Sequence, residues 1–266
     1  MSPNELVSLD YWESTHSQPR WRLPSKLNVS ARDLLRIVGS HIRPRMRVLE
    51  IGCAPAKHLA YFAKVRGANV CGLDYSEPGI RMSRELFSKL NLRGEFRCED
   101  IFTTALPEAS FDLVYSLGVI EHFEDARAIV EKHLFLTKPG GRVVISIPNF
   151  GGVYGRLERY FCPELLNIHN LNIMSCRALL HLVPERTACE PLAHRSGRMS
   201  PWIINFEKKW PATLAKATTL ALNALGLIQP FDIGPLCPLL VLTMKKCATP
   251  QTPCLPSPQF AGDHSR

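Results

Sequence analysis

The sequence predicts an α/β fold built on a mostly parallel sheet, and two observations carry that prediction. From residue 47 to about residue 148, short β-branched segments alternate with segments of helical spacing, as in parallel strands joined by crossover helices. One segment, Arg142–Pro148, is rich in Val and Ile, which indicates burial on both faces, as a central parallel strand requires. We therefore expect one α/β domain with helices on both faces of its sheet.

The predicted elements follow one another in a regular order. A strand is predicted at Arg47–Gly52, and the helix after it, Lys57–Gly67, ends at a glycine that acts as a stop signal. A turn formed by Lys138-Pro-Gly-Gly precedes the strand Arg142–Pro148. The remaining strands are predicted at Asn69–Asp74, Glu95–Asp100 and Phe111–Leu117, and the remaining helices at Pro78–Leu90 and Asp125–Leu136.

The regular alternation ends after Pro148. The pattern then predicts a mixed helical region over residues 156–183, a loop rich in Arg and Pro up to Pro201, a helix over residues 212–227 and a last strand at Leu239–Lys245. The last twenty residues contain four prolines and few apolar residues, so residues 247–266 are predicted to be a disordered tail. The folded domain is expected to span residues 1–246.

The charge of the chain is unevenly distributed. The chain has 32 Lys and Arg against 24 Asp and Glu, but residues 50–150 hold 12 basic against 13 acidic residues, so the basic surplus lies on the flanks. A dedicated nucleic-acid-binding protein usually concentrates its basic residues along one stripe or arm. We therefore expect no nucleic-acid partner, and the flanks leave room for an anionic small substrate or an anionic membrane surface.

The amino terminus and the cysteines bear on the compartment. The first residues lack a basic segment followed by an apolar one, so no secretion signal is expected, and no apolar run reaches the roughly 18–20 residues that span a bilayer. The nine cysteines are odd in number and form no C-x-x-C pair, which disfavours both a disulfide framework and a zinc site. We expect free thiols, no metal and a cytoplasmic location.

The strongest local motif is the junction between the first strand and the first helix, residues 50–56 (EIGCAPA). A turn of small residues that opens a helix lets a ligand approach backbone N–H groups. Asp74 ends the next strand 22 residues after Gly52, where an acid can accept both hydroxyls of a ribose. A dinucleotide motif would need later glycines, whose places hold Ala54 and Lys57, and Glu50 would repel a pyrophosphate but suit an ammonium group.

Taken together, these segments resemble the class I S-adenosylmethionine-dependent methyltransferases. LEIGCAPA is similar to the glycine loop of that family, GLDYS to its ribose-binding strand end and CEDIF to its adenine-binding acid. FDLVYSLGVIEHFED and LTKPGGRVVISIPN resemble the motifs of its fourth and fifth strands. The resemblance implies a Rossmann-like, doubly wound, mostly parallel seven-stranded sheet with an antiparallel last strand and an inserted helical cap. It divides the domain into an N-terminal lid (1–40), a cofactor-binding core (47–149) and a substrate cap (150–200).

The resemblance also implies the site residues. Glu50 and Gly52 would lie beside the methionine part of S-adenosylmethionine, with Cys53 and Ala54 completing the loop, and Asp74 would hold the ribose hydroxyls. The remaining expected contacts are Tyr75 beside the adenine, Asp100 and Ile101 at its amino edge, and Leu117 and Gly118 near the sulfonium. Ala54 and Ala56 replace two loop glycines, and a Cβ there costs about 1 kcal/mol if the backbone needs positive φ.

Two residues after the fourth strand are candidates for catalysis. His122 is the most plausible base for a hydroxyl acceptor, because an unperturbed imidazole titrates near neutral pH, and Glu121 could orient the ring or the substrate. The same Glu-His pair also shapes the site without proton transfer in this family. His169, in the cap, is a further candidate for contact with the acceptor, and the aromatic residues Trp12 and Trp21 are candidates for a lid.

The expected reaction is methyl transfer to an oxygen of a small molecule, with an acidic, phosphorylated or lipid-linked acceptor favoured by the basic flanks and by Arg156, Arg159, Arg195 and Arg198. Transfer to nitrogen or carbon, a non-catalytic cofactor-binding protein and a nicotinamide oxidoreductase stay open as alternatives. Trp202, Lys208 and Lys209 precede the apolar helix at 212–227. This combination can mark peripheral contact with a membrane, although packing of that helix on the sheet explains the same pattern. The oligomeric state is not predicted.

Overall fold

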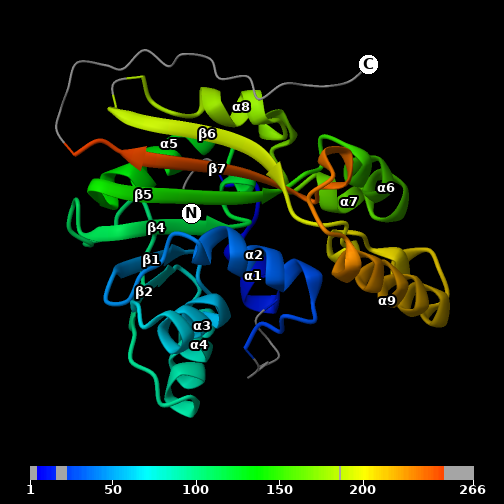
Figure 1. Cartoon of the computed structure of the whole chain (residues 1–266), viewed down its shortest axis with the longest axis horizontal. Coiled ribbons are helices and arrows are strands. Elements are labelled where there is room, and N and C mark those ends of the chain that lie inside the picture. The colour runs from blue at the N-terminus through cyan, green and yellow to red at the C-terminus, as the bar shows by residue number, and fades with distance from the viewer. Residues whose placement is uncertain (1–4, 16–22, 186, 249–266) are drawn as a thin grey trace.

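A seven-stranded sheet runs through the computed structural model, which describes residues 5–15, 23–185 and 187–248. The strand order is β3-β2-β1-β4-β5-β7-β6 (Figure 1). The first five strands are parallel, whereas β7 runs antiparallel to both β5 and β6. The strands are β1 Arg47–Ile51, β2 Asn69–Asp74, β3 Glu95–Cys98, β4 Phe111–Leu117, β5 Thr137–Pro148, β6 Cys189–Ser196 and β7 Leu239–Lys246.

Helices cover both faces of this sheet (Figure 1). They are α1 Leu9–Thr15, α2 Val29–Gly39, α3 Lys57–Arg66, α4 Glu77–Lys89, α5 Ala126–Leu136, α6 Val153–Phe161, α7 Pro163–Leu166, α8 Cys176–His181 and α9 Ala212–Ile228. Short 3₁₀ turns lie at Ile120–His122, Leu171–Ile173, Pro201–Ile203, Phe206–Lys208 and Gly234–Leu236.

Local sequence explains where several helices begin and end. The side chains of Ser76 and Asp125 accept backbone N–H groups in the first turns of α4 and α5, which satisfies donors that have no partner inside the helix. Helix α3 ends at Gly67, whose φ of 65° places it in the left-handed region that glycine adopts without strain. The stop at Gly67 is the one predicted from the sequence, whereas α4 begins one residue before the predicted Pro78 and α5 one residue after the predicted Asp125.

The two faces of the sheet form separate hydrophobic layers. Val48 packs in the layer that contains α2, α3 and α4, whereas its neighbour Leu49 packs in the layer that contains α5. This alternation follows from the period of two in a strand. Both residues are fully buried, so β1 is covered on both faces, as expected for a central parallel strand.

The strand order reverses at β1, because the chain adds β2 and β3 on one side of it and β4 and β5 on the other, and this places the site. Strand β1 pairs with β2 on one side and with β4 on the other, so that Ile51 lies opposite Leu73 and Ser116. The loop after β1, the end of β2 and the turn after β4 therefore meet at one edge of the sheet. In open α/β sheets ligands bind at such a switch point, outside the carboxyl ends of the strands.

The expected seven-stranded, mostly parallel sheet with an antiparallel last strand is confirmed, and three details of the expectation are wrong. Strand β3 ends at Cys98 rather than Asp100. The Lys138-Pro-Gly-Gly segment belongs to β5, where the pairing with β4 shifts in register and Gly140 has a φ of 78°. The expected loop before Pro201 contains β6, an edge strand. The presence of Pro191 and exposed polar residues in β6 is typical of an edge position.

Helix α9 also departs from the expectation of a helix packed on the sheet. Its contacts are mainly with α2 and with the 3₁₀ turns Pro201–Ile203 and Phe206–Lys208, and it projects from the body of the fold (Figure 1). Only Ala215 and Gly226 of this helix are buried. Among the described helices, none is long and apolar enough to cross a bilayer.

The described cysteines are free thiols, as expected: Cys53, Cys71, Cys98, Cys162, Cys176, Cys189, Cys237 and Cys247. Trp21 and nearly all of the expected tail lie outside the described residues.

Candidate functional site

A cavity of about 180 Å³ lies at the carboxyl ends of β1, β2 and β4, and we refer to it as the first cavity. Eight of the ten residues expected to bind the cofactor line it: Gly52, Ala54, Asp74, Tyr75, Asp100, Ile101, Leu117 and Gly118. The structure therefore brings together residues from four separate sequence motifs. That these eight residues contact the cofactor stays a prediction.

The loop after β1 approaches the cavity with its backbone. Gly52 has a φ of 68°, and a Cβ at this position would lie 2.5 Å from Cγ2 of Val119, so only glycine fits without displacement. Ala56 also lies in the left-handed region, with a φ of 57°, so this position carries the strain that the sequence raised as a possibility. Ala54 is not among the described residues with positive φ.

Asp74 joins the end of β2 to this loop. Its side chain is 9% exposed, its Oδ2 accepts the N–H of Ala54 at 3.0 Å, and its Oδ1 accepts the N–H of Ser76 at 2.9 Å. These bonds fix the orientation of the carboxylate at the edge of the cavity, which Asp74 lines. The arrangement can accept ligand hydroxyls without moving.

Glu50 and Cys53 lie outside the lining of the first cavity. Glu50 is buried beside the Tyr115 hydroxyl and the N–H of Leu59, and burial raises the pKa of its carboxyl to about 8 against the opposing effect of these two donors. Its Oε1 lies 3.8 Å from Nδ1 of His58. Glu50 thus braces the start of α3, and Cys53 packs against Gly72 of β2.

The segment after β3 forms another wall. Oδ1 of Asp100 accepts the N–H of Phe102 at 2.7 Å, which holds this turn in shape, and Ile101 is buried. Glu99, which the sequence analysis did not single out, also lines the cavity and accepts the Thr104 hydroxyl at 2.6 Å. Burial and the nearby carboxylates raise the pKa of Tyr75, so this hydroxyl is neutral.

The amino-terminal segment closes the first cavity. Glu5 forms an isolated β-bridge with Phe123, and the N–H of Leu6 donates to the carbonyl of His122 at 2.8 Å. Trp12 lines the cavity and packs edge-on against His122, with ring centroids 5.0 Å apart. Trp12 therefore lies at the first cavity, as a lid residue would, and the lid itself stays a prediction. No motif in the sequence predicts that Glu5 lines the first cavity.

A second cavity, of about 430 Å³, meets the first at Trp12, Leu117, Gly118 and His122. The cap and the turn after it supply much of its lining, including Phe150, Leu165, Ile168, His169, Trp202 and Asn205. No Lys or Arg lines this cavity among the described residues. An acceptor placed here would lie next to the first cavity across Leu117 and Gly118.

Glu121, His122 and His169 form a polar cluster at the second cavity. One donor atom from each residue lies within 4.8 Å of those of the other two. Nδ1 of His122 lies 2.8 Å from the carbonyl oxygen of Ile168, and Nδ1 of His169 lies 2.7 Å from that of Leu165. Because a carbonyl oxygen only accepts, each Nδ1 carries the proton, and each Nε2 keeps a lone pair.

Burial sets the protonation of this cluster. It lowers the pKa of His122 to about 4, assisted by His169 and opposed by the Ile168 carbonyl, and it also lowers the pKa of His169. Burial raises the pKa of Glu121 to about 8. Both rings are therefore neutral at neutral pH, and Glu121 Oε2 has no hydrogen-bond partner among the described residues.

Asn170 ties the cap to the turn that carries Glu121 and His122. Its N–H donates to the Glu121 carbonyl at 2.6 Å, and its Nδ2 donates to the carbonyls of Phe123 and Glu124. These bonds bring His169 beside His122, with ring centroids 4.7 Å apart. His169 thus meets Glu121 and His122, which lie 48 and 47 positions earlier in the chain.

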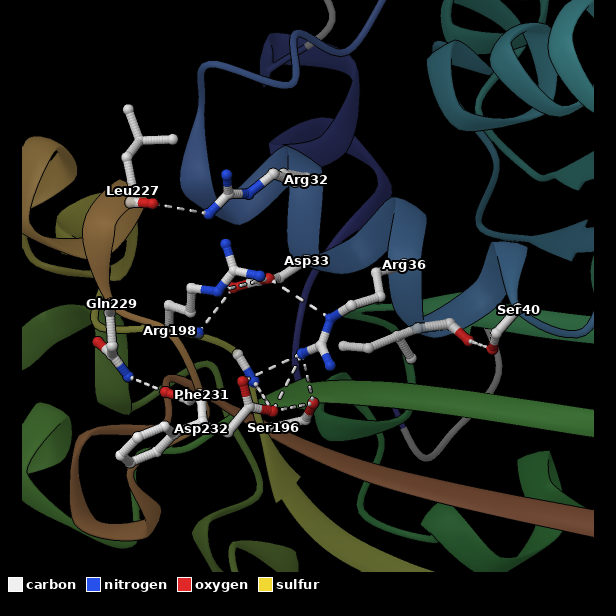
Figure 2. Close-up of polar contacts among 12 residues, drawn as sticks. Arg32, Asp33, Arg36, Ser40, Ser196, Arg198, Leu227, Gln229, Phe231 and Asp232 are labelled. Carbon is white, nitrogen blue, oxygen red and sulfur yellow. Dashed lines mark hydrogen bonds and ion pairs between the residues drawn. The ribbon is translucent and has the colours of Figure 1, made fainter.

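The four arginines expected to recognise an acidic acceptor lie elsewhere. None of Arg156, Arg159, Arg195 and Arg198 lines either cavity. Nε of Arg198 lies 4.0 Å from Oδ1 of Asp33, in a network between α2 and the end of β6 (Figure 2). The guanidinium of Arg198 therefore pairs with Asp33 within the fold and does not face an acceptor in either cavity.

Comparison with known proteins agrees with this geometry. Residues 49–145 match the methyltransferase domain family. The chain is 33% identical over 106 residues to phosphoethanolamine N-methyltransferase 1 of Arabidopsis thaliana, and 34% identical over 104 residues to a ubiquinone biosynthesis O-methyltransferase of Idiomarina loihiensis. The matched segments span 40% and 39% of this chain but only 22% and 42% of those proteins.

Solved structures share the fold at low sequence identity. Phosphoethanolamine N-methyltransferase 2 of Haemonchus contortus, in complex with S-adenosylhomocysteine, superimposes with a TM-score of 0.58 at 17% identity, over 81% of this chain and 52% of that one. The plantazolicin methyltransferase BpumL gives a TM-score of 0.52 at 18% identity, over 90% and 89% of the two chains. The likeness extends the match from the core to most of the fold.

Proposed function

We propose that this chain, whose residues 49–145 belong to the class I S-adenosylmethionine-dependent methyltransferase family, transfers a methyl group from S-adenosylmethionine to an oxygen of a small molecule. The observation that carries the proposal is the meeting of the two cavities at Leu117, Gly118 and His122. One cavity gathers the motif residues expected around the cofactor, and the other is a separate space for an acceptor.

The first cavity fits the polar groups of S-adenosylmethionine. The oriented carboxylate of Asp74 suits the two ribose hydroxyls, and the wall formed by Asp100 and Ile101 suits the edge of an adenine ring. Ala54 directs its N–H to Asp74, so this loop position contributes shape and orientation. When bound, the sulfonium supplies an activated methyl group whose leaving group is a neutral thioether.

His122 is placed to assist transfer to a hydroxyl. Its Nε2 keeps a lone pair, and the ring contacts both cavities. In the step we propose, the acceptor O–H proton passes to Nε2 of His122 as the oxygen forms its bond to the methyl carbon. The methyl–sulfur bond breaks with its electron pair on sulfur. The lowered pKa keeps the ring neutral before the step, but it also makes His122 a weaker base than the unperturbed imidazole assumed from the sequence, so positioning supplies much of the rate.

The lining of the second cavity favours an apolar, lipid-linked acceptor over an acidic one. Leu165, Ile168, Phe150 and Trp202 give it apolar walls, and no lysine or arginine there pairs with an anion among the described residues. A buried anion without a partner is costly. We therefore place the acceptor hydroxyl on an apolar molecule.

An exposed apolar surface next to this cavity supports the same acceptor class. Leu214, Leu220, Leu225 and Ile228 on α9 and Phe231 after it are between 49% and 77% exposed. The 3₁₀ turn that carries Trp202, a residue of the second cavity, contacts α9. Lys209 and Lys216 are exposed in the same region. Apolar side chains flanked by lysines are typical of helices that lie on anionic membranes.

Binding to vesicles tests this part of the proposal. The full chain should sediment with vesicles that contain phosphatidylserine and less with neutral phosphatidylcholine vesicles. Replacing Leu220 and Ile228 by serine should reduce binding, whereas Leu171→Ser, an exposed apolar residue elsewhere, should not. Equal binding by the wild type and the α9 variant would contradict a membrane role for this surface.

The enzyme assay uses S-adenosylmethionine with a labelled methyl group and acceptors in matched pairs, a long-chain phenol or alcohol against the corresponding amine. The proposal expects transfer to the hydroxyl and a loss of kcat of about a hundredfold in His122→Gln. His181→Gln, at a histidine of α8 that lines neither cavity, is the control. Transfer to the amine alone would favour N-methylation, for which the similarity to an N-methyltransferase is the present support. Cofactor binding with no turnover on either acceptor would favour a non-catalytic protein.

A further inference from the structure

We propose that Glu121, His122 and His169 bind a divalent transition-metal ion at the second cavity. The inference deepens the proposed function, because the ion would hold the acceptor oxygen at the junction with the first cavity. It rests on three features of the described residues: the spacing of the ligand atoms, the orientation of the two imidazoles and a buried carboxyl group whose Oε2 has no hydrogen-bond partner.

The spacing of the donor atoms suits one ion. One ligand atom from each of the three residues, either Nδ1 or Nε2 for the histidines, lies within 4.8 Å of those of the other two. Ligand atoms about 2 Å from a common ion lie roughly 3–4 Å apart, so small side-chain movements bring all three into coordination. From the sequence we expect no metal, because that expectation rests only on cysteine motifs. A cluster between the turn after β4 and the cap has no motif in the sequence.

Each imidazole is held in the form that binds a metal. His122 donates Nδ1–H to the Ile168 carbonyl, and His169 donates Nδ1–H to the Leu165 carbonyl. A ligating histidine almost always donates its other ring N–H to a carbonyl or carboxylate, which fixes the tautomer and the ring orientation. In both residues the nitrogen left for an ion is Nε2.

Glu121 supplies a buried carboxyl group whose Oε2 has no hydrogen-bond partner among the described residues. The residue is 1% exposed, and the described residues place no lysine or arginine in an ion pair with it. A buried carboxyl group without partners is costly. A cation bound between this carboxylate and the two imidazoles would remove that cost.

The donor set indicates the kind of ion and its role. Two imidazoles and one carboxylate suit Mn²⁺, Fe²⁺, Co²⁺ or Zn²⁺ better than the oxygen-seeking Mg²⁺ and Ca²⁺. Three protein ligands leave coordination positions open toward the cavity. A hydroxyl that binds there loses its proton to solvent more readily and attacks the methyl carbon as a metal-bound oxyanion. In this state the Nε2 lone pair of His122 binds the ion, so the ion takes the place of His122 as the activating group.

Titration of the chelator-treated full chain with Co²⁺ tests the proposal, because the visible absorption of Co²⁺ reports its coordination without any enzyme assay. We expect one saturable site per chain, with affinity at least about tenfold weaker in Glu121→Gln and in His169→Gln. His181→Gln, at an exposed histidine outside the cluster, should bind as the wild type does. If Glu121→Gln does not fold, His169→Gln, at a partly exposed residue, provides the test.

Absence of saturable Co²⁺ binding by the wild type, or unchanged binding in both variants, would overturn the metal site. Calorimetric titration with S-adenosylhomocysteine on the same samples separates this failure from failure of the proposed function. Protein that binds S-adenosylhomocysteine but no Co²⁺ refutes the metal site alone. Protein that binds Co²⁺ but no S-adenosylhomocysteine keeps the site and refutes the function on which its role rests.

Discussion

The carboxylate of Asp33 accepts the backbone N–H of Arg198 at 2.6 Å and so joins two segments 165 residues apart. Figure 2 shows Asp33 between the side chains of Arg36 and Arg198, with Nε atoms 3.7 and 4.0 Å from Oδ1. Arg36 in turn binds Asp232, whose Oδ2 accepts the Ser196 hydroxyl. This network holds α2 against the end of β6 and the segment before β7.

The first prediction separates the hydrogen bond of Asp33 from its charge. Asp33 is 1% exposed, and burial raises its pKa to about 6 despite Arg36 and Arg32. Asp33→Asn, which keeps an acceptor for the Arg198 N–H, should be at least as stable as the wild type at pH 7.5. Asp33→Ala should be less stable than Asp33→Asn by about 1–3 kcal/mol, because the buried N–H loses its acceptor. Chemical denaturation measures both, and equal stability of the two variants would contradict the assignment.

The second prediction is the pH dependence of the difference in stability between the wild type and Asp33→Asn. The groups that face Asp33 are Arg32 and Arg36 on its own helix and Arg198 and Asp232 from the segments packed on it. Between its unfolded pKa of 3.8 and its folded pKa of about 6, the folded state binds more protons than the unfolded state. Stability from this group therefore falls as pH rises. The unfolding free energy of the wild type relative to Asp33→Asn should decrease from pH 4 to pH 7, by at most about 3 kcal/mol, and a flat difference would contradict the raised pKa.

The third prediction concerns the loop after β1. Gly52→Ala combines positive φ with a Cβ 2.5 Å from Val119, whereas Gly140→Ala has a φ of 78° with no atom within 4 Å of the added Cβ. Gly140→Ala should cost about 1 kcal/mol from backbone strain alone. Gly52→Ala should cost more than that and should also weaken binding of S-adenosylhomocysteine at least tenfold. Thermal unfolding and calorimetry check the pair, and a Gly52→Ala protein that binds like the wild type would show that the loop does not contact the cofactor.

The fourth prediction distinguishes the two cavities. Trp12 lines both, whereas Trp202 lines only the second. Trp12→Ala should weaken binding of S-adenosylhomocysteine about fivefold to twentyfold, because it removes an aromatic wall and exposes His122 to water. Trp202→Ala should leave that affinity unchanged and raise the KM for the acceptor. Equal effects of the two substitutions on S-adenosylhomocysteine binding would contradict the division into cofactor and acceptor spaces.

The core of the fold could be predicted because its signals are local. Strands β1, β2 and β4 and the second half of β5 are short apolar runs buried on both faces, and the turns between them carry glycine or helix-starting residues. Strand β6 could not, because Pro191 and its exposed side chains hide an edge strand whose partner, β7, lies some fifty residues later.

Part of the candidate site could also be predicted from the sequence, and part could not. Gly52, Asp74 and Asp100 stand at strand ends, where parallel topology brings them together, so their meeting could be predicted. Glu5 reaches the first cavity through an isolated bridge to Phe123, and His169 reaches His122 through the docking of the cap by Asn170. Contacts of this kind depend on tertiary packing and leave no spacing pattern in the sequence.

The most direct test of the account is calorimetric titration of the purified chain with S-adenosylmethionine and, in parallel, with NAD. Asp74→Asn keeps the size of the side chain but loses the charge that strengthens its bonds to the ribose hydroxyls, and Glu85→Gln, an exposed residue of α4, is the matched control. We predict about micromolar binding of S-adenosylmethionine, weakened at least tenfold in Asp74→Asn and unchanged in Glu85→Gln, with no binding of NAD. Binding of NAD, or no binding of S-adenosylmethionine, would contradict the assignment of the first cavity to this cofactor.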